Sequence, residues 1–186
     1  MHPLQSEDWA NARKQMGIET VSLEGFLLTF HKIPFTDFKL VIVGKQGWLY
    51  DHIFEKVKIM NLQDKIIFTG HVSDEELISY YQNAFCLALP SLYEGFGIPV
   101  LEAMSYNCPV IASFSSSLPE IGGEACLYFD PKNSIDLLEK FKTLQDNKEL
   151  RKELISKGKQ RIKEFSWKKC GEQTLEVIKN YASTTI

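Results

Sequence analysis

The sequence predicts an α/β protein in which a parallel sheet lies between two layers of helices, a Rossmann-like three-layer α/β/α arrangement. Short apolar runs, several of them closed by glycine or proline, alternate with segments of helical periodicity. Such runs are typical of strands buried on both faces, and their alternation with helices favours parallel strands joined by crossovers. The length of 186 residues favours one compact domain.

The first two strands and their helices can be assigned in order. FKLVIVG at 38–44 is a continuous apolar run closed by glycine, and KIIFTG at 65–70 is a shorter one. Between them, apolar residues recur at helical spacing over 49–60. SDEE at 73–76 has the Ser-x-x-Glu pattern of a capping box, which predicts that the next helix begins there.

The second half of the chain continues the alternation. Three more apolar runs predict strands at 84–90, 109–113 and 126–129. Pro99 suits the first turn of a helix between the first two of these strands. Ser117 with Glu120 has the spacing of a second capping box. Three further helices are expected over roughly 134–146, 147–165 and 167–181, with Ser166 as N-cap of the last.

Composition excludes several classes of protein. A net charge of −3 indicates no broad basic surface for nucleic acid. No apolar run is long enough to cross a bilayer, and the first residues lack the apolar stretch of a signal peptide. The cysteines form no Cys-x-x-Cys pair, and Cys86, Cys108 and Cys126 are interpreted as reduced core thiols of a cytoplasmic protein. The histidines show no metal-ligand spacing, so no metal is expected.

The segment after the third strand has the residues best suited to bind a ligand. PSLYEGFGIPVLEAM at 90–104 holds Glu94 and Glu102 in an otherwise apolar, glycine-rich stretch. Ligands of parallel α/β sheets bind beyond the carboxyl ends of the strands, and a helix N-terminus attracts phosphate. Two carboxylates able to accept hydrogen bonds from hydroxyls beside that phosphate site indicate a sugar nucleotide. From spacing alone, a purely structural role is equally compatible: Glu102 would complement the helix dipole and the glycines would make a turn.

A family resemblance favours the first interpretation. PSLYEGFGIPVLEAMSYNCPVIAS, followed by SSLPEIGGEACLYFDP, closely resembles the carboxyl-terminal half of family 4 (group 1) retaining glycosyltransferases, which have the GT-B fold. Their Glu-x7-Glu signature is matched by Glu94 and Glu102. IIFTGHVSDEEL and LVIVGKQGW are also similar to this family, particularly to its mannosyltransferase-like members. The resemblance implies that residues 18–186 form a nucleotide-sugar-binding domain, after an irregular or partly disordered segment at 1–17.

The resemblance implies a role for each matched position. Glu94 matches the catalytic residue that contacts the donor-sugar hydroxyls and helps to hold the transition state, and Glu102 matches the residue that binds the ribose diol. The donor sugar and phosphates are expected to meet Gly95, Phe96, Gly97 and Ile98. The nucleobase is expected to lie beside the main chain of Gly70, His71 and Val72. Tyr80 and Tyr81 are expected to pack rather than to stack on a ligand, and Trp48 and Trp167 to be core or interdomain anchors.

The sequence departs from the family where a basic pair is expected. The family stabilises the leaving diphosphate with helix N-termini and an Arg/Lys pair, without an obligatory metal. That pair follows the first strand of the domain, but MHPLQSEDWAN is too polar to be this strand. Met16 stands where the family has lysine, and Arg13 and Lys14 are out of register. The candidates for diphosphate binding are therefore Arg13, Lys14 and Lys45.

The implied function is that of a hexosyltransferase domain that binds a GDP- or UDP-sugar for retaining transfer, with GDP-mannose slightly favoured. The length leaves no room for the acceptor-binding amino-terminal domain of a GT-B enzyme. We therefore expect the chain to bind the donor weakly and not to transfer sugar alone. An acceptor glycan or lipid-linked glycan would be reached through that domain or a partner chain. Because Trp167 and the last helix would lack their cover, we also expect self-association.

Two other classes stay open at this point. One is a non-catalytic sugar-nucleotide-binding or assembly subunit of a split glycosyltransferase, which the altered amino-terminal region favours. The other is a different GT-B enzyme, such as a sugar-nucleotide epimerase, which the GFGIPVLEAM context disfavours. The basic residues between Lys148 and Lys169 raise the alternative of a peripheral position at the inner membrane face. Interspersed glutamates make a solvated helical face the preferred interpretation of that run.

Overall fold

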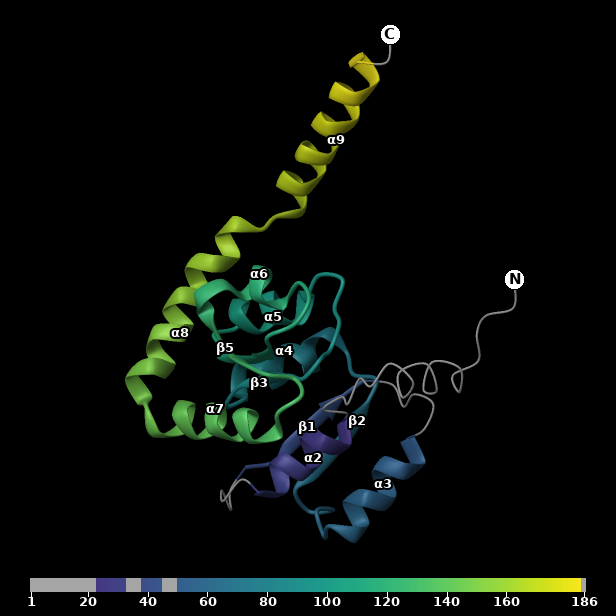
Figure 1. Cartoon of the computed structure of the whole chain (residues 1–186), viewed down its shortest axis with the longest axis vertical. Helices are drawn as coiled ribbons and strands as arrows, with labels where there is room; N and C mark the ends of the chain where they lie inside the picture. The colour runs from purple at the N-terminus through teal and green to yellow at the C-terminus, as the bar shows by residue number, and fades with distance from the viewer. Residues whose placement is uncertain (1–22, 33–37, 45–49, 185–186) are drawn as a thin grey trace, which may run out of the picture.

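The computed structural model describes residues 23–32, 38–44 and 50–184, and Figure 1 shows how their helices and strands are arranged. The elements follow one another as α2 (Leu23–Lys32), β1 (Leu40–Val43), α3 (Tyr50–Ile59), β2 (Ile66–Gly70), α4 (Asp74–Asn83), β3 (Leu87–Leu89), α5 (Ile98–Ser105), β4 (Val110–Ser113), α6 (Leu118–Gly122), η1 (Gly123–Ala125), β5 (Cys126–Phe129), α7 (Ser134–Asp146), α8 (Lys148–Arg161), η2 (Ile162–Glu164) and α9 (Trp167–Thr184). The predictions for segment 1–17, Trp48, Arg13, Lys14 and Lys45 lie outside the described residues.

Local capping explains where several helices begin. At α4 both halves of the predicted capping box form: the Ser73 N–H donates to Glu76 at 2.8 Å, and the Glu76 N–H donates to the Ser73 hydroxyl at 3.2 Å. The Ser166 hydroxyl oxygen accepts a hydrogen bond from the Lys169 N–H at 3.0 Å, which confirms that Ser166 caps the start of α9. The second predicted capping box is wrong. Ser117 precedes α6 but makes no capping bond, because its hydroxyl donates to another segment instead.

The strands β3, β4 and β5 form a parallel sheet with helices on both faces, as the sequence predicts. Val110 and Ala112 of β4 pack on one side with α4, α5 and α6. Ile111, between them, packs on the other side with α7 and α8. This alternation follows from the two-residue period of a strand. All four residues of β4 are buried, as expected for a central strand.

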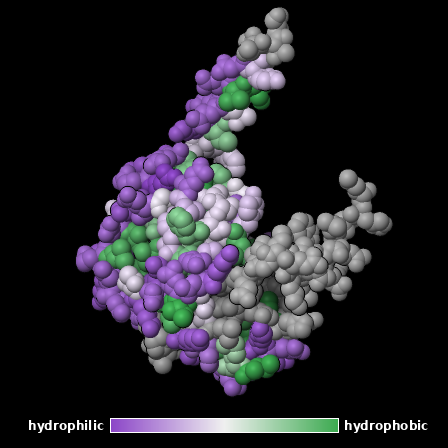
Figure 2. Space-filling model, in the orientation of Figure 1, coloured by the Kyte–Doolittle hydropathy of each residue, from purple (hydrophilic) through white to green (hydrophobic). Residues whose placement is uncertain are grey.

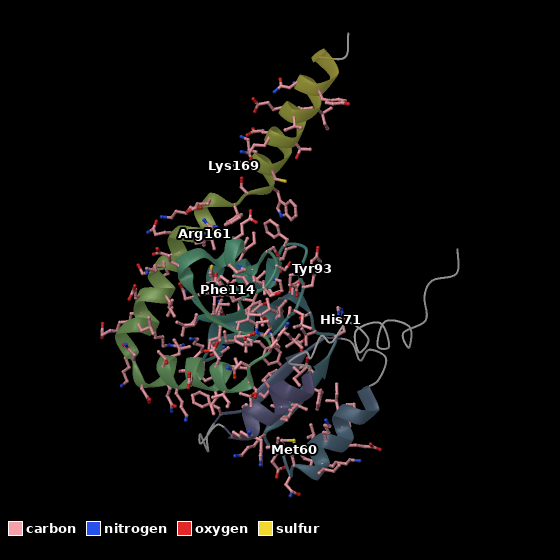
Figure 3. The ribbon with its side chains drawn as sticks, in the orientation of Figure 1. Met60, His71, Tyr93, Phe114, Arg161 and Lys169 are labelled. Carbon is pink, nitrogen blue, oxygen red and sulfur yellow. The ribbon has the colours of Figure 1, made fainter. Side chains whose placement is uncertain are left out.

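The strands β1 and β2 form a separate two-stranded parallel sheet. Their side chains make a second core with α2 and α3, centred on the buried residues Leu27, Val57, Leu62 and Ile66. The strands of the described residues are thus divided between two parallel sheets, because none of these strands pairs with both β1 and β3. The carboxyl ends of β2, β3 and β4 lead to the loops that bear His71, Tyr93 and Phe114, which are labelled in Figure 3.

Two of the three cysteines interpreted as core thiols are buried, and Cys86 is half-buried. Cys108 and Cys126 are buried and unpaired with any other cysteine. Burial raises the pKa of the Cys108 thiol to about 11 and that of the Cys126 thiol to about 12. Burial also raises the pKa of Cys86. These three thiols are therefore protonated at neutral pH and weak nucleophiles. Cys170, on α9, is exposed.

The last helix, α9, extends away from the body of the protein (Figure 1). Its apolar side chains lie on one side and its charged ones on the other (Figure 2). Trp167, at its start, is 84% exposed, so the core role considered for it is wrong, and its role as an interdomain anchor stays a prediction. Within the described residues, no helix is both long and apolar enough to cross a membrane.

Candidate functional site

The loop between β3 and α5, residues 90–97, carries Glu94 and is held in place by serines from the next strand connection. Ser113, the last residue of β4, is fully buried and its hydroxyl lies 2.6 Å from the Ser91 carbonyl oxygen and 3.1 Å from that of Leu89. The hydroxyl of Ser115 donates to the carbonyl of Leu92. These bonds fasten the start of the loop to the end of the neighbouring strand.

The following serines hold the backbone of Glu94 itself. The Ser116 hydroxyl donates to the Glu94 carbonyl oxygen at 2.6 Å. The Ser117 hydroxyl lies 2.9 Å from both the Glu94 and the Phe96 carbonyl oxygens. A hydroxyl has one proton, so these two contacts share it. The three serines Ser115–Ser117 were not predicted to have this role, although they begin one residue after a parallel strand and so lie next to the loop that follows the neighbouring strand.

We expect Ser113→Ala to lower the free energy of unfolding by about 1–3 kcal/mol, because the half-buried carbonyls of Ser91 and Leu89 would lose the Ser113 hydroxyl as a donor. Urea denaturation followed by circular dichroism measures the change. Ser105→Ala is the matched control, because the Ser105 hydroxyl is exposed and bonds only to Leu101 of its own helix. Equal stabilities of the two variants would contradict the role assigned to Ser113.

The start of α5 depends on Gly97. This residue is the N-cap of α5 and has φ +102°, which residues with a Cβ rarely adopt. A Cβ there would also lie 2.8 Å from Cδ2 of Leu118, a fully buried side chain. Pro99 occupies the first turn, as predicted, where its lack of an N–H leaves no donor unsatisfied. The helix begins without a side-chain cap, so its N-terminal dipole faces the loop.

The two glutamates of the Glu-x7-Glu signature lie at the two ends of the segment that joins the 90–97 loop to the first turns of α5. Glu94 is half-buried in the loop, and one of its carboxylate oxygens accepts from the Ser91 hydroxyl at 2.7 Å. Glu102 lies one turn into α5 and is also half-buried. Both carboxylates therefore keep unused lone pairs while one oxygen of each is fixed by a neighbour.

Tyr81 on α4 fixes Glu102, and sequence reasoning missed this role. The Tyr81 hydroxyl donates to Oε2 of Glu102 at 3.1 Å, and only 9% of the tyrosine is exposed. Burial and the Glu102 carboxylate raise the pKa of Tyr81, so its hydroxyl stays protonated and able to donate. The ring stacks parallel to that of Tyr106, with centroids 6.2 Å apart. Tyr81 thus does pack, as predicted, but its hydroxyl also orients the carboxylate.

We expect Tyr81→Phe to weaken binding of a nucleotide sugar about 3- to 30-fold, because the carboxylate of Glu102 would lose a charged hydrogen bond that holds its rotamer. The stacked ring is kept, so the fold should persist. Tyr80→Phe, at the adjacent exposed tyrosine, is the matched control. Titration of both variants by calorimetry measures the effect, and an unchanged affinity for Tyr81→Phe would contradict it.

The residues expected beside the nucleobase follow β2. The register between β1 and β2 shifts between Ile42 and Val43, which leaves an extra residue, Thr69, in β2. Such bulges redirect a strand end. Gly70 then adopts φ +70°, and the chain turns through His71 and Val72 into the capped start of α4. His71 is exposed, in agreement with a loop position for its side chain.

The described residues contain no group of three or more His, Cys, Asp or Glu side chains placed to hold a metal ion. The metal-free chemistry expected from the resemblance therefore stays a prediction. The three candidate diphosphate cations lie outside the described residues, so their relation to the site also stays a prediction.

Comparison with known proteins identifies the family. The model of glycosyl transferases group 1 matches residues 19–161, which include the whole loop, α5 and the serine run. The chain therefore belongs to the glycosyl transferases group 1 family, and the resemblance stated from the sequence is confirmed. The O-antigen chain mannosyltransferase B of Escherichia coli is 35% identical over 163 residues, which cover 85% of this chain and 42% of that protein. The chain spans less than half the length of the curated relatives first matched.

Solved structures agree on the fold. The carboxyl-terminal domain of a group 1 glycosyl transferase (LpcC) from Francisella tularensis is 27% identical with a TM-score of 0.68, over 78% of this chain and 79% of that one. Sucrose-phosphate synthase from Thermosynechococcus elongatus, 24% identical, has a TM-score of 0.77 and covers 99% of this chain and 50% of that one. Anabaena Alr3699/HepE in complex with UDP-glucose is 17% identical, with a TM-score of 0.75 over 95% of this chain and 54% of that one. The prediction of an α/β half of a GT-B glycosyltransferase is confirmed.

Proposed function

We propose that this chain is the donor-binding domain of a retaining hexosyltransferase of the family 4 type and binds a GDP- or UDP-sugar through the segment from Glu94 to Glu102. The observation that carries the proposal is the fixed Glu102 carboxylate, held by the buried Tyr81 hydroxyl at 3.1 Å beside an uncapped helix start. A carboxylate with free lone pairs suits a ribose diol, and a helix N-terminus suits the diphosphate.

At the other end of the site, Glu94 is proposed to contact the donor-sugar hydroxyls. Its backbone is fixed by Ser116 and Ser117, and its carboxylate by Ser91. Such prior fixation matters because groups that already face the developing charge need not reorganise during the reaction. The start of α5 would stabilise the leaving diphosphate, together with cations for which Arg13, Lys14 and Lys45 stay the candidates.

The identity of the donor base is part of this proposal. The relative from Escherichia coli is named a mannosyltransferase, which supports GDP-mannose, whereas the Anabaena protein of the same fold binds UDP-glucose.

We further propose that the chain does not transfer sugar alone. The acceptor, a glycan or a lipid-linked glycan, would be bound by another domain or chain. Robust transfer by the chain alone would refute this.

A second candidate is a non-catalytic sugar-nucleotide-binding or assembly subunit of a split glycosyltransferase. The altered amino-terminal region of the sequence favours it. Cytoplasmic localisation stays a proposal, as does attachment at the inner membrane face. The glutamates on α8 favour a solvated face, since Lys152 pairs with Glu149 at 2.8 Å and Lys157 with Glu153 at 2.8 Å. Liposome co-sedimentation at low salt tests attachment.

Ligand-observed NMR with a panel of GDP- and UDP-sugars tests the proposed function. We expect saturation transfer to the sugars of one base and weaker transfer with Glu102→Ala. No binding to any donor would overturn the donor-site proposal and favour the assembly subunit. Formation of an epimerised sugar nucleotide during the measurement would instead indicate an epimerase.

We expect the chain to self-associate through α9 at high concentration. Leu175, Val177 and Ile178 are more than half exposed and lie with Trp167 on one side of the helix. Burying this apolar side of α9 removes its surface from water, and each Å² of apolar surface removed contributes about 25 cal/mol of stabilisation. Light scattering should give a mass above that of the monomer for the wild type and the monomer mass for Ile178→Glu. Glu176→Gln, on the charged side, is the control, and a monomeric wild type would contradict the expectation.

A further inference from the structure

The segment between α8 and α9, residues 162–166, meets the loop that carries Glu94. The ring of Phe165, directly after η2, lies edge-to-face against the ring of Phe96, with centroids 6.0 Å apart and an interplanar angle of 90°. This T-shaped arrangement is one of the favourable geometries for two aromatic rings. The contact joins the carboxyl-terminal part of the chain to the candidate donor loop, two residues after Glu94.

The 162–166 segment is held in place by the helix before it. Helix α8 packs closely on α5 at Gly158, where a Cβ would lie 3.1 Å from a side-chain atom of α5. One turn later comes Arg161, the last residue of α8, which is labelled in Figure 3. Its Nε donates to the Ile121 carbonyl oxygen at 3.0 Å, and its Nη2 donates to that of Glu120. The end of α8 is therefore fixed against both α5 and α6.

Phe165 is held independently of the loop. The guanidinium carbon of Arg161 lies 4.9 Å from the centroid of the Phe165 ring, a distance typical of a cation–π contact. The Phe165 N–H donates to the Ile162 carbonyl oxygen at 3.2 Å. The ring is half-buried and packs on the core cluster that includes Leu118. Phe165 thus offers a fixed surface to Phe96.

Phe96 needs such outside support because the local sequence does not fix it. Its neighbours Gly95 and Gly97 have a wide range of accessible backbone angles, and its ring is 45% exposed. The Ser117 hydroxyl holds the Phe96 carbonyl, but its single proton is shared with the carbonyl of Glu94. The ring contact with the 162–166 segment is therefore a second and separate constraint on the loop.

These constraints set the direction of two N–H groups. The carbonyls of Glu94 and Phe96 face the serine run, and no described peptide bond is cis. In a trans peptide the C=O and the following N–H point in opposite directions. The N–H groups of Gly95 and Gly97 therefore point away from the serines. Neither donates to another residue within 23–32, 38–44 and 50–184.

We propose that Phe165 is a positioning residue of the donor site: its ring fixes Phe96 and so aims the Gly95 and Gly97 N–H groups at the donor sugar and its distal phosphate. The identity of the ligand rests on the proposed function, whereas the fixing of the loop depends on no ligand. Phe165 should therefore influence how the sugar and distal phosphate bind. It should not influence the nucleoside, whose ribose is expected at Glu102.

NMR of the free chain tests whether Phe165 fixes the loop. With Phe165→Leu, we expect the Phe96 ring signals to shift, because the neighbouring ring is lost. The ¹⁵N order parameters of Gly95 and Gly97 should fall from about 0.85, typical of rigid backbone, toward about 0.6. Phe165→Tyr keeps the ring and should keep the wild-type values. Trp167→Leu is the control, because it removes a ring that is 84% exposed two residues further along.

Titration with two ligands tests the consequence for binding. Phe165→Leu should weaken binding of the nucleotide sugar about 3- to 10-fold, the range expected for loss of an aromatic pair. Binding of the matching nucleoside monophosphate, which lacks the sugar and the distal phosphate, should change less than about twofold. Phe96→Leu should have a similar effect, and the double variant should add little to either single one, because both remove the same contact. Phe165→Tyr should bind as the wild type does.

Several results would overturn the proposal. Unchanged order parameters in Phe165→Leu, or low ones already in the wild type, would mean that Phe165 does not fix the loop. Equal weakening for the two ligands would indicate a general structural role. If Phe165→Leu does not fold, Phe96→Leu removes the same contact from the exposed loop, and the same loss of order at Gly95 and Gly97 is expected. A wild type that binds no nucleotide sugar would overturn the proposed function, while the order parameters would still decide whether Phe165 fixes the loop.

Discussion

Replacing Glu102 with alanine is expected to weaken nucleotide-sugar binding by about 10- to 100-fold. A carboxylate that accepts hydrogen bonds from a ribose diol contributes about 1.5–3 kcal/mol for a charged bond, and 1.4 kcal/mol is a factor of ten. The carboxylate is half-buried and already oriented by Tyr81 at 3.1 Å. Little further ordering is therefore needed when the diol binds, so most of the hydrogen-bond energy should appear in the affinity.

Three variants separate binding from folding in this experiment. Glu102→Gln keeps the size and one acceptor oxygen, so its affinity should lie between those of the wild type and Glu102→Ala. Glu139→Ala removes an exposed glutamate of α7, on the other face of the three-stranded sheet, and should bind as the wild type does. Calorimetric titration gives the affinities, and thermal unfolding shows whether each variant is folded. Wild-type affinity in a folded Glu102→Ala would leave Glu102 with a structural role only.

The elements could be predicted because their signals are local. A short continuous apolar run indicates a strand without tertiary information, and CLYF forms β5 with the predicted bounds. The capping box at Ser73 likewise depends on residues three apart. Glu94 and Glu102 could be selected for the same reason, because a seven-residue interval in one loop and helix is visible in the sequence.

What could not be predicted depends on contacts between distant segments. Ser117 has a sequence neighbour suited to capping, but Glu94, 23 residues earlier, offers its hydroxyl a carbonyl at 2.9 Å. Tyr81 and Glu102 are 21 residues apart and meet only because α4 and α5 cover the same face of the sheet. The separation of β1 from β3 is likewise a property of how the sheets are placed, since each strand taken alone has an ordinary buried-strand sequence.

Replacing Gly97 with alanine is expected to lower the free energy of unfolding by about 2–6 kcal/mol. A residue with a Cβ at φ +102° is strained by about 1–3 kcal/mol, and forcing a methyl group into packed surroundings costs about 1–3 kcal/mol more. The new Cβ would lie 2.8 Å from Leu118 Cδ2, and Leu118 is fully buried at the start of α6 and cannot simply turn away.

Gly95→Ala is the matched control for this substitution. Gly95 lies two residues earlier in the same loop, and a Cβ there would meet no atom within 4 Å. Its unfolding free energy should stay within about 0.5 kcal/mol of the wild type, as is usual for open surface positions. Urea denaturation of both variants gives the comparison. Equal stability of the two alanine variants would mean that the loop can relax around Leu118, and the fixed geometry on which the proposed site depends would have to be abandoned.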